Sequence, residues 1–210
     1  GSGRAARVTD DQWREYIDWI AALGAISLGY PDANNINAPG NGPYLAVINQ
    51  AAAGPIFSLP NVAIEERVAQ RLVELIPCAE SVRFLKTGSE CTEAAIRVAR
   101  AATGRDVVLT CGYHGWHSWY AATREECPGV PLAYKGLARA FAYNDLASLD
   151  RAIAWATDDE AVVWYATIPR ATGVAAIILE PTLVEPPAPG FLEGVRERAT
   201  RIGAVLIFDE

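Results

Sequence analysis

The chain has 210 residues, of which 51% are hydrophobic and 20% are charged, a composition typical of globular proteins. Its formal net charge of -7 argues against nucleic acid as a partner, and no apolar run approaches the roughly 20 residues that a membrane-spanning helix needs. The four separated cysteines and two histidines show no metal-ligand spacing, so we expect reduced thiols, no metal site and a cytoplasmic location.

The first part of the chain predicts a small segment ahead of the main domain. We place the segment at residues 1–55 and the main domain at 56–210. In chain order, we predict a weakly anchored lead-in at 1–10, a short apolar helix or strand at 13–20, and a Gly-, Pro- and Asn-rich loop at 24–42. Helices should follow at 44–53 and at 63–76, where the chain passes into the main domain.

The main domain alternates strands with helices. We predict strands at 82–86, 107–110, 139–143, 174–180 and 204–209, and helices at 90–102, 145–156 and 190–202. The last two strands are continuous apolar runs, which a sheet covered on both faces requires. The fold class is therefore α/β, a three-layer α/β/α domain with a mostly parallel sheet. Residues 161–172 look like an extra segment without an evident role.

Both ends of the sequence suggest that it belongs to a longer protein. The sequence contains no methionine, and its last strand stops at Asp209 and Glu210. Proteins of the α/β class place ligand residues at the carboxyl ends of strands, so a natural domain rarely stops there. We therefore expect a piece of a longer chain.

A strand, a tight turn and a helix start meet at Lys86–Ala95. Thr87 and Glu90 have the spacing of a capping box, and Gly104 has the position of a left-handed helix cap. Gly88 lets the backbone approach a ligand, and the first amides of the helix, with Ser89, favour an anion such as phosphate. An ordinary capped helix explains the same residues equally well.

Two further features follow predicted strands. Tyr113 and His114 lie between glycines after the strand at 107–110, where an aromatic ring can lie against a planar ligand. Asp209 is the last residue of its predicted strand and could hold a protonated ring nitrogen. The alternative interpretation of the loop with Tyr113 and His114 is a rigid loop rich in aromatic residues. The alternative for Asp209 is the N-cap of a following helix. Because each feature follows a parallel strand, we expect Gly88, Tyr113 and Asp209 to share one pocket.

Together, these residues resemble the class III aminotransferases, pyridoxal-phosphate enzymes of fold type I, and in particular glutamate-1-semialdehyde aminomutase and its relatives. The resemblance spans nearly the whole chain, because its motifs occur in order. The motifs are 16–19, 24–30, 84–115, Glu180-Pro181, 187–193 and 207–210.

The resemblance implies a role for each matching residue. Gly88 and Ser89 would bind the phosphate of pyridoxal 5'-phosphate, and Tyr113 would stack on its ring, with His114 shaping the loop. Asp209 would pair with the ring nitrogen and keep it protonated. Glu180 would support the site or face the substrate, although nearby amides could equally satisfy it. The implied partners are a small-molecule amino donor and acceptor and a second copy in a homodimer.

One departure from the family pattern concerns catalysis. Class III enzymes hold their cofactor as a Schiff base on a lysine, yet Lys86 and Lys135 are the only lysines here, and neither has the family position. We expect no catalytic residue in this chain, with the Schiff-base lysine beyond Glu210, and therefore an inactive piece of an aminotransferase or aminomutase. A non-catalytic binding module that keeps the fold is the main alternative. A nucleotide-binding transferase is a weaker alternative, because the turn lacks the lysine of a P-loop and the glycine spacing of a dinucleotide site. The substrate stays open between glutamate semialdehyde, an ω-amino acid and an amino or keto sugar.

Overall fold

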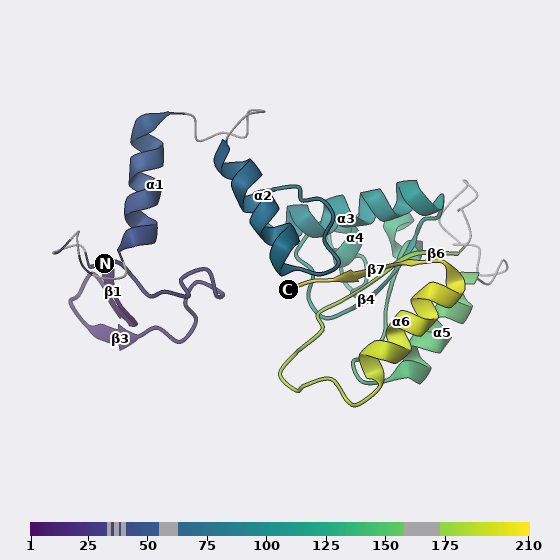
Figure 1. Cartoon of the computed structure of the whole chain (residues 1–210). Helices are drawn as coiled ribbons and strands as arrows, with labels where there is room; N and C mark the ends of the chain where they lie inside the picture. Colours follow the sequence, from purple (N-terminus) through teal and green to yellow (C-terminus); the bar gives the residue numbers. More distant parts are fainter. Residues whose placement is uncertain (33–34, 36–37, 39–40, 55–62, 158–172) are drawn as a thin grey trace. The chain divides into compact units, whose positions relative to one another are not determined.

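A computed structural model describes residues 1–32, 35, 38, 41–54, 63–157 and 173–210. The chain divides into two compact units, Gly1–Arg83 and Phe84–Glu210 (Figure 1). The boundary predicted after residue 55 and the extra segment at 161–172 fall on residues outside this description, so both stay predictions.

The first unit begins with a small antiparallel sheet. Strands β1 (Ser2–Arg4), β2 (Arg7–Thr9) and β3 (Glu15–Ile17) pair in that order. The turn between the last two is closed by Asp10, whose carboxylate accepts hydrogen bonds from the amides of Gln12 and Arg14 at 2.9 Å each. The prediction of a weakly anchored lead-in at 1–10 is therefore wrong. Strands of three residues are too short for their alternation to show in the sequence.

Two helices complete the first unit. They are α1 (Gly42–Ala53) and α2 (Ala63–Leu75), which agree with the predicted helices within two residues at each end. Ahead of α1, the buried Asn41 side chain bonds the backbone of Asp32 in both directions, at 3.0 and 3.1 Å. Within the described ranges, no helix is both long and apolar enough to cross a membrane.

The second unit alternates helices and strands around a parallel sheet. The strand order is β5-β4-β6-β7, and every neighbouring pair is parallel. This confirms the predicted α/β class. The elements are α3 (Gly88–Thr103), β4 (Val107–Cys111), α4 (Ser118–Ala121), the 3₁₀ helix η1 (Leu132–Gly136), β5 (Ala138–Ala140), α5 (Leu146–Thr157), β6 (Val174–Leu179), α6 (Phe191–Ile202) and β7 (Val205–Phe208).

Two predicted strands differ from the structure. Residues 82–86 pair with no strand in the described part of the chain, so that prediction is wrong. Val82 and Phe84 are half-buried between exposed neighbours, and this burial of an extended segment imitates the pattern of a strand. The strand expected at 139–143 ends at Ala140. The amide of Phe141 still donates to Thr110 O at 2.9 Å, and the amide of Ala142 then donates to Ser148 Oγ at 2.8 Å.

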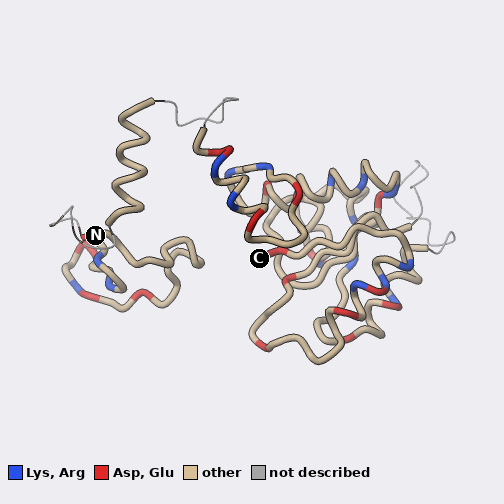
Figure 2. Tube along the Cα trace, viewed as in Figure 1, with Lys and Arg blue, Asp and Glu red and all other residues tan. Residues whose placement is uncertain are grey.

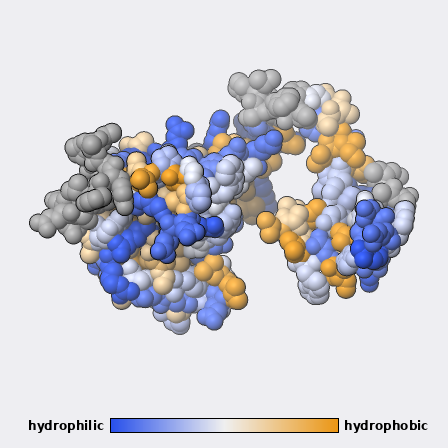
Figure 3. Space-filling model, turned by 180° about the vertical axis from the view of Figure 1, so that it is seen from behind, coloured by the Kyte–Doolittle hydropathy of each residue, from blue (hydrophilic) through white to orange (hydrophobic). Residues whose placement is uncertain are grey.

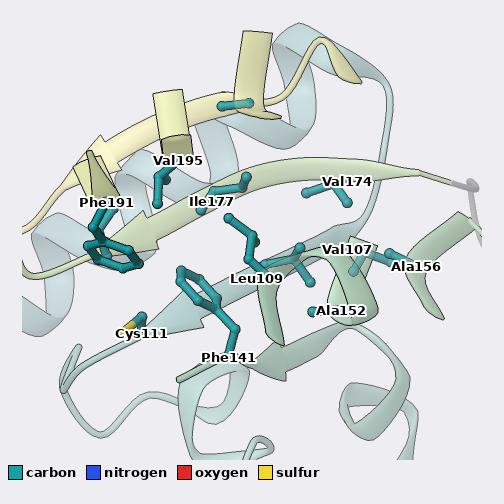
Figure 4. Close-up of a cluster of buried hydrophobic side chains, with 13 residues drawn as sticks. Val107, Leu109, Cys111, Phe141, Ala152, Ala156, Val174, Ile177, Phe191 and Val195 are labelled. Carbon is teal, nitrogen blue, oxygen red and sulfur yellow. The ribbon is translucent and has the colours of Figure 1, made fainter. Parts of the chain in front are cut away.

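Helices cover both faces of the sheet. Alternate residues of a strand point to opposite faces, so Val107 and Leu109 pack against α5 and α6, while Val108 packs against α3. Figure 4 shows the first of these cores, in which Phe141 and Phe191 close the end near Cys111. The result is the predicted three-layer arrangement.

Figure 2 shows charged residues along the helices of the second unit. Arg198 of α6 donates to both carboxylate oxygens of Asp150 on α5, at 2.7 Å each, and these hydrogen bonds lower the pKa of Asp150. The pair ties together the two helices that cover one face of the sheet.

Candidate cofactor site

The carboxyl ends of three strands meet at one edge of the sheet. Cys111, Leu179 and Phe208, the last residues of β4, β6 and β7, are in register. The amide of Glu180 donates to Cys111 O at 3.2 Å, and the amide of Asp209 donates to Leu179 O at 3.0 Å. The ladder therefore continues for one residue past the strands and places Glu180 and Asp209 at the same edge.

The first turn of α3 is held by a capping box. The Thr87 hydroxyl accepts from the amide of Glu90 at 3.2 Å, and the Glu90 carboxylate accepts from the amide of Thr87 at 3.0 Å. At the other end, Gly104 takes the left-handed conformation at φ 66°. The predicted capping box and the predicted cap at Gly104 are confirmed, and the helix begins two residues before its predicted start.

This helix start offers unpaired donors. Within the described residues, the amides of Gly88 and Ser89 have no hydrogen-bond partner, because the first amides of a helix have none inside it. A methyl group added at Gly88 would meet nothing within 4 Å, so the space beside it is open. With the Ser89 hydroxyl and the positive end of the helix dipole, these donors can receive an anion.

The loop after β4 lies directly against this helix start. A Cβ added at Gly115 would lie 2.2 Å from Ser89 Oγ, and Gly115 has φ +97°, so only glycine fits. The buried Thr92 hydroxyl is 3.0 Å from His114 O and 3.1 Å from Ser89 O, and it can donate to either. These contacts fix the loop to α3.

His114 joins the loop to the last strand. Its side chain is fully buried, and its Nδ1 lies 2.8 Å from Asp209 Oδ2 while its Nε2 lies 3.1 Å from Cys111 O. The Trp119 ring stacks nearly parallel to the imidazole at 6.3 Å. Asp209 Oδ1 has no hydrogen-bond partner in the described part of the chain, and the Asp209 side chain is 28% exposed. One carboxylate oxygen is thus held and the other is available.

Tyr113 and Glu180 meet beside this pair. The amide of Tyr113 donates to Glu180 Oε2 at 2.7 Å, so one Glu180 oxygen is satisfied by a backbone amide, as the alternative interpretation anticipated. The Tyr113 ring is 58% exposed and makes an edge contact with Tyr120 at 5.6 Å between centroids. Gly112 leaves the space that the Glu180 carboxylate occupies, since a Cβ there would lie 2.3 Å from Oε2.

Burial also changes two groups beneath the site. Burial, followed by the charge of Glu180, raises the pKa of Cys111 to about 11. Burial likewise raises the pKa of Tyr120, whose hydroxyl donates to Gly112 O at 2.8 Å. Both groups therefore stay protonated at neutral pH and serve as structural support rather than as nucleophile or base.

The predicted residues occupy one continuous cluster. Ser89, Gly115, His114 and Asp209 are linked by direct contacts, Gly88 adjoins Ser89, and Tyr113 is linked through Glu180. Sequence analysis missed three supporting side chains: Thr92, Trp119 and Tyr120. A threonine inside a helix and aromatic residues in a loop carry no distinct pattern, and only their burial in the fold shows their role.

Two hollows lie away from this cluster. One of about 270 Å³ is on α2, and one of about 370 Å³ lies beside β5 and η1. Neither is lined by a predicted site residue, so we assign the chemistry to the sheet edge.

The cluster can hold a ligand at two points. An anionic group fits the donors at Gly88 and Ser89, and a protonated ring nitrogen fits the free oxygen of Asp209. The exposed face of Tyr113 is the adjacent aromatic surface. An aromatic heterocycle that carries an anionic substituent would match this combination.

Comparisons with known proteins agree with this chemistry. Residues 2–210 match the model of the family described as aminotransferase class-III. The chain is 38% identical over 209 residues to a 3-aminobutyryl-CoA aminotransferase of Cloacimonas acidaminovorans, covering 99% of this chain and 46% of the relative. It is 33% identical over 224 residues to a glutamate-1-semialdehyde 2,1-aminomutase of Syntrophomonas wolfei, again covering 99% and 46%. The chain spans about half the length of the curated relatives it matches.

Solved structures show the same fold. An omega-transaminase from Sphaerobacter thermophilus superposes with a TM-score of 0.78 at 28% identity, covering 99% of this chain and 47% of that one. The FumI protein of Sphingopyxis sp. MTA144, solved in its PLP internal aldimine form, gives 0.76 at 26%, covering 97% and 45%. The fold is that of the fold type I transferases, in part, and the family and these neighbours support pyridoxal phosphate as the cofactor. The chain belongs to the class-III aminotransferase family.

Proposed function

We propose that the protein containing this chain transfers amino groups with pyridoxal phosphate, as an aminotransferase or an aminomutase. The observation that carries the proposal is the continuous link from Ser89 through Gly115 and His114 to Asp209. This link would hold an anion bound at Ser89 and the carboxylate of Asp209 at the same sheet edge. The names of the matched relatives, an aminotransferase and an aminomutase, support a small amino compound as substrate.

The residues present fit pyridoxal phosphate. The unpaired amides of Gly88 and Ser89, with the Ser89 hydroxyl, would hold the phosphate beside the open space at Gly88. The Tyr113 ring would lie against the pyridine, and Asp209 Oδ1 would accept a hydrogen bond from the ring nitrogen. When bound, the cofactor supplies a protonated pyridine that accepts electrons from the substrate carbon. The charge on Asp209 would keep the proton on that nitrogen.

We propose that the lysine that carries the cofactor lies beyond Glu210. Lys135 donates from Nζ to the backbone carbonyls of Arg124 and Glu125, and it lines the hollow beside β5 rather than the cluster. Lys86 precedes the turn, and its backbone amide donates a hydrogen bond to the Glu90 carboxylate. Neither residue matches the family position, so the 210-residue chain should bind pyridoxal phosphate weakly and reversibly and should not turn over. Borohydride should trap no stoichiometric cofactor on either lysine.

We also propose a homodimer. Large apolar side chains stand exposed on the first unit, among them Trp13 at 86%, Trp19 at 88% and Leu23 at 94%. Figure 3 shows apolar surface on both units. In the second unit, Trp116 is also exposed, whereas Trp119 is buried and cannot contribute to an interface. Sedimentation should show association of the chain with rising concentration, and a monomer at high concentration would contradict this assembly.

Kinetics of the full-length protein test the proposed roles. With saturating cofactor, Asp209→Ala should lower kcat by about 10² to 10³, because a strong electrostatic contribution to the ring is lost. Ser89→Ala should raise the dissociation constant of the cofactor and leave kcat near the parent value. If Asp209→Ala turns over normally while Ser89→Ala is inactive, the roles are wrongly assigned. A protein that binds the cofactor but transfers no amino group would instead support the non-catalytic module.

A further inference from the structure

The two contacts of the His114 ring determine where its protons lie. Nε2 lies 3.1 Å from Cys111 O, and a carbonyl oxygen can only accept a hydrogen bond. The same oxygen also accepts from the amide of Glu180, so both of its lone pairs are used. A ring nitrogen without a proton at this position would face the oxygen with a lone pair in a buried site. Nε2 therefore carries a proton.

The other ring nitrogen faces a second acceptor. Nδ1 lies 2.8 Å from Asp209 Oδ2, a hydrogen-bond distance that also requires a proton between the two atoms. Because an imidazole is ordinarily a much stronger base than a carboxylate, that proton belongs on Nδ1. We propose that His114 is an imidazolium, protonated on both nitrogens, in a buried ion pair with the Asp209 carboxylate.

The surroundings can sustain a buried charge. A buried cation is tolerated when it is paired and its protons are hydrogen-bonded, and both protons of His114 have acceptors. The Trp119 ring lies nearly parallel to the imidazole, with 6.3 Å between the ring centroids, and helps to bury it. The Asp209 side chain is 28% exposed, so the carboxylate keeps contact with solvent.

This pair gives His114 a positioning role, a step that rests on the proposed function. The buried ring cannot touch a ligand, since its side chain is fully buried. It would instead hold one oxygen of Asp209 and favour the ionised carboxylate, so that the other oxygen meets the ring nitrogen of the cofactor as an anion. A neutral His114 would leave this carboxylate with a weaker partner.

Nitrogen NMR of the chain without cofactor tests the proton positions directly. The sequence has two histidines, His114 and His117, so a chain labelled with ¹⁵N-histidine yields two easily separated ring systems. At neutral pH, long-range proton–nitrogen correlation should place both nitrogens of His114 in the range of protonated ring nitrogens. One unprotonated nitrogen in the parent spectrum would overturn the proposal, and this result needs no variant.

Two variants identify the partner of the proton. Asp209→Asn offers an amide donor to Nδ1, so His114 should become neutral, with Nδ1 unprotonated and Nε2 unchanged. Glu93→Gln is the matched control, because Glu93 lies 3.5 Å from His117 Nδ1, and it should affect His117 alone. Retention of both protons in Asp209→Asn would refute the assigned pair. Because no cofactor is present, the result is independent of whether pyridoxal phosphate binds.

Discussion

Gly115→Ala would test the contact between the loop and the start of α3. At φ +97°, the added Cβ would lie 2.2 Å from Ser89 Oγ and 2.8 Å from Ser89 Cβ. The backbone conformation costs an L-residue about 1 to 2 kcal/mol. Forcing a methyl group into filled space costs about 1 to 3 kcal/mol more. We therefore expect the free energy of unfolding to fall by about 2 to 5 kcal/mol.

Gly129→Ala separates the two contributions. Gly129 has a similar φ of +81°, but a Cβ there would meet nothing within 4 Å. Gly129→Ala should lower the free energy of unfolding only by the cost of the left-handed backbone conformation, about 1 to 2 kcal/mol. Urea unfolding followed by circular dichroism gives both values. Equal losses in the two variants would refute the packing of Gly115 against Ser89. The same displacement of Ser89 should weaken cofactor binding in Gly115→Ala and leave it unchanged in Gly129→Ala.

Two further predictions concern the support beneath the site. Thr92→Val removes the buried hydroxyl that donates to His114 O or Ser89 O and should cost about 1 to 3 kcal/mol in urea unfolding. The exposed Thr157→Val should stay within about 0.5 kcal/mol, and similar losses in both variants would contradict the buried hydrogen bond. Because the pKa of Cys111 is raised from 9.0 to about 11, the folded chain keeps a proton that the unfolded chain releases, so stability should be full below pH 9 and fall between pH 9 and 11. Across this range, the free energy of unfolding should depend less on pH in Cys111→Ala, whereas Cys91→Ala should keep the pH dependence of the parent. Identical slopes of free energy against pH in all three proteins would contradict the raised pKa.

Much of the second unit was predictable because its signals are local. The capping box at Thr87 and Glu90 depends only on residues three apart, and Gly104 takes the conformation that its position suggests. The apolar runs of β6 and β7 reflect burial on both faces of the sheet. The order of strands and helices then placed Glu180 and Asp209 at one edge, because parallel strands end together.

The remaining features depend on contacts between distant residues. The extended segment at 82–86 alternates like a strand, but pairing requires a neighbour that the sequence alone does not reveal. Trp119 looks like one more aromatic residue of an apolar loop, and only the packing of α4 against the sheet buries it. The bond between His114 and Asp209 spans 95 residues, so no local pattern could indicate it.

Equilibrium binding of pyridoxal phosphate and of pyridoxal to the chain tests the central claim most directly. Pyridoxal has the ring nitrogen but no phosphate, so the two ligands separate the two ends of the site. Ser89→Ala should weaken the binding of pyridoxal phosphate by about 10- to 150-fold, the equivalent of one hydrogen bond to a charged group. The same variant should leave the binding of pyridoxal unchanged. Asp209→Asn should weaken the binding of both ligands by the same factor. If Ser89→Ala weakens both ligands alike, or Asp209→Asn affects neither, the two ends of the cofactor are not held where the structure indicates.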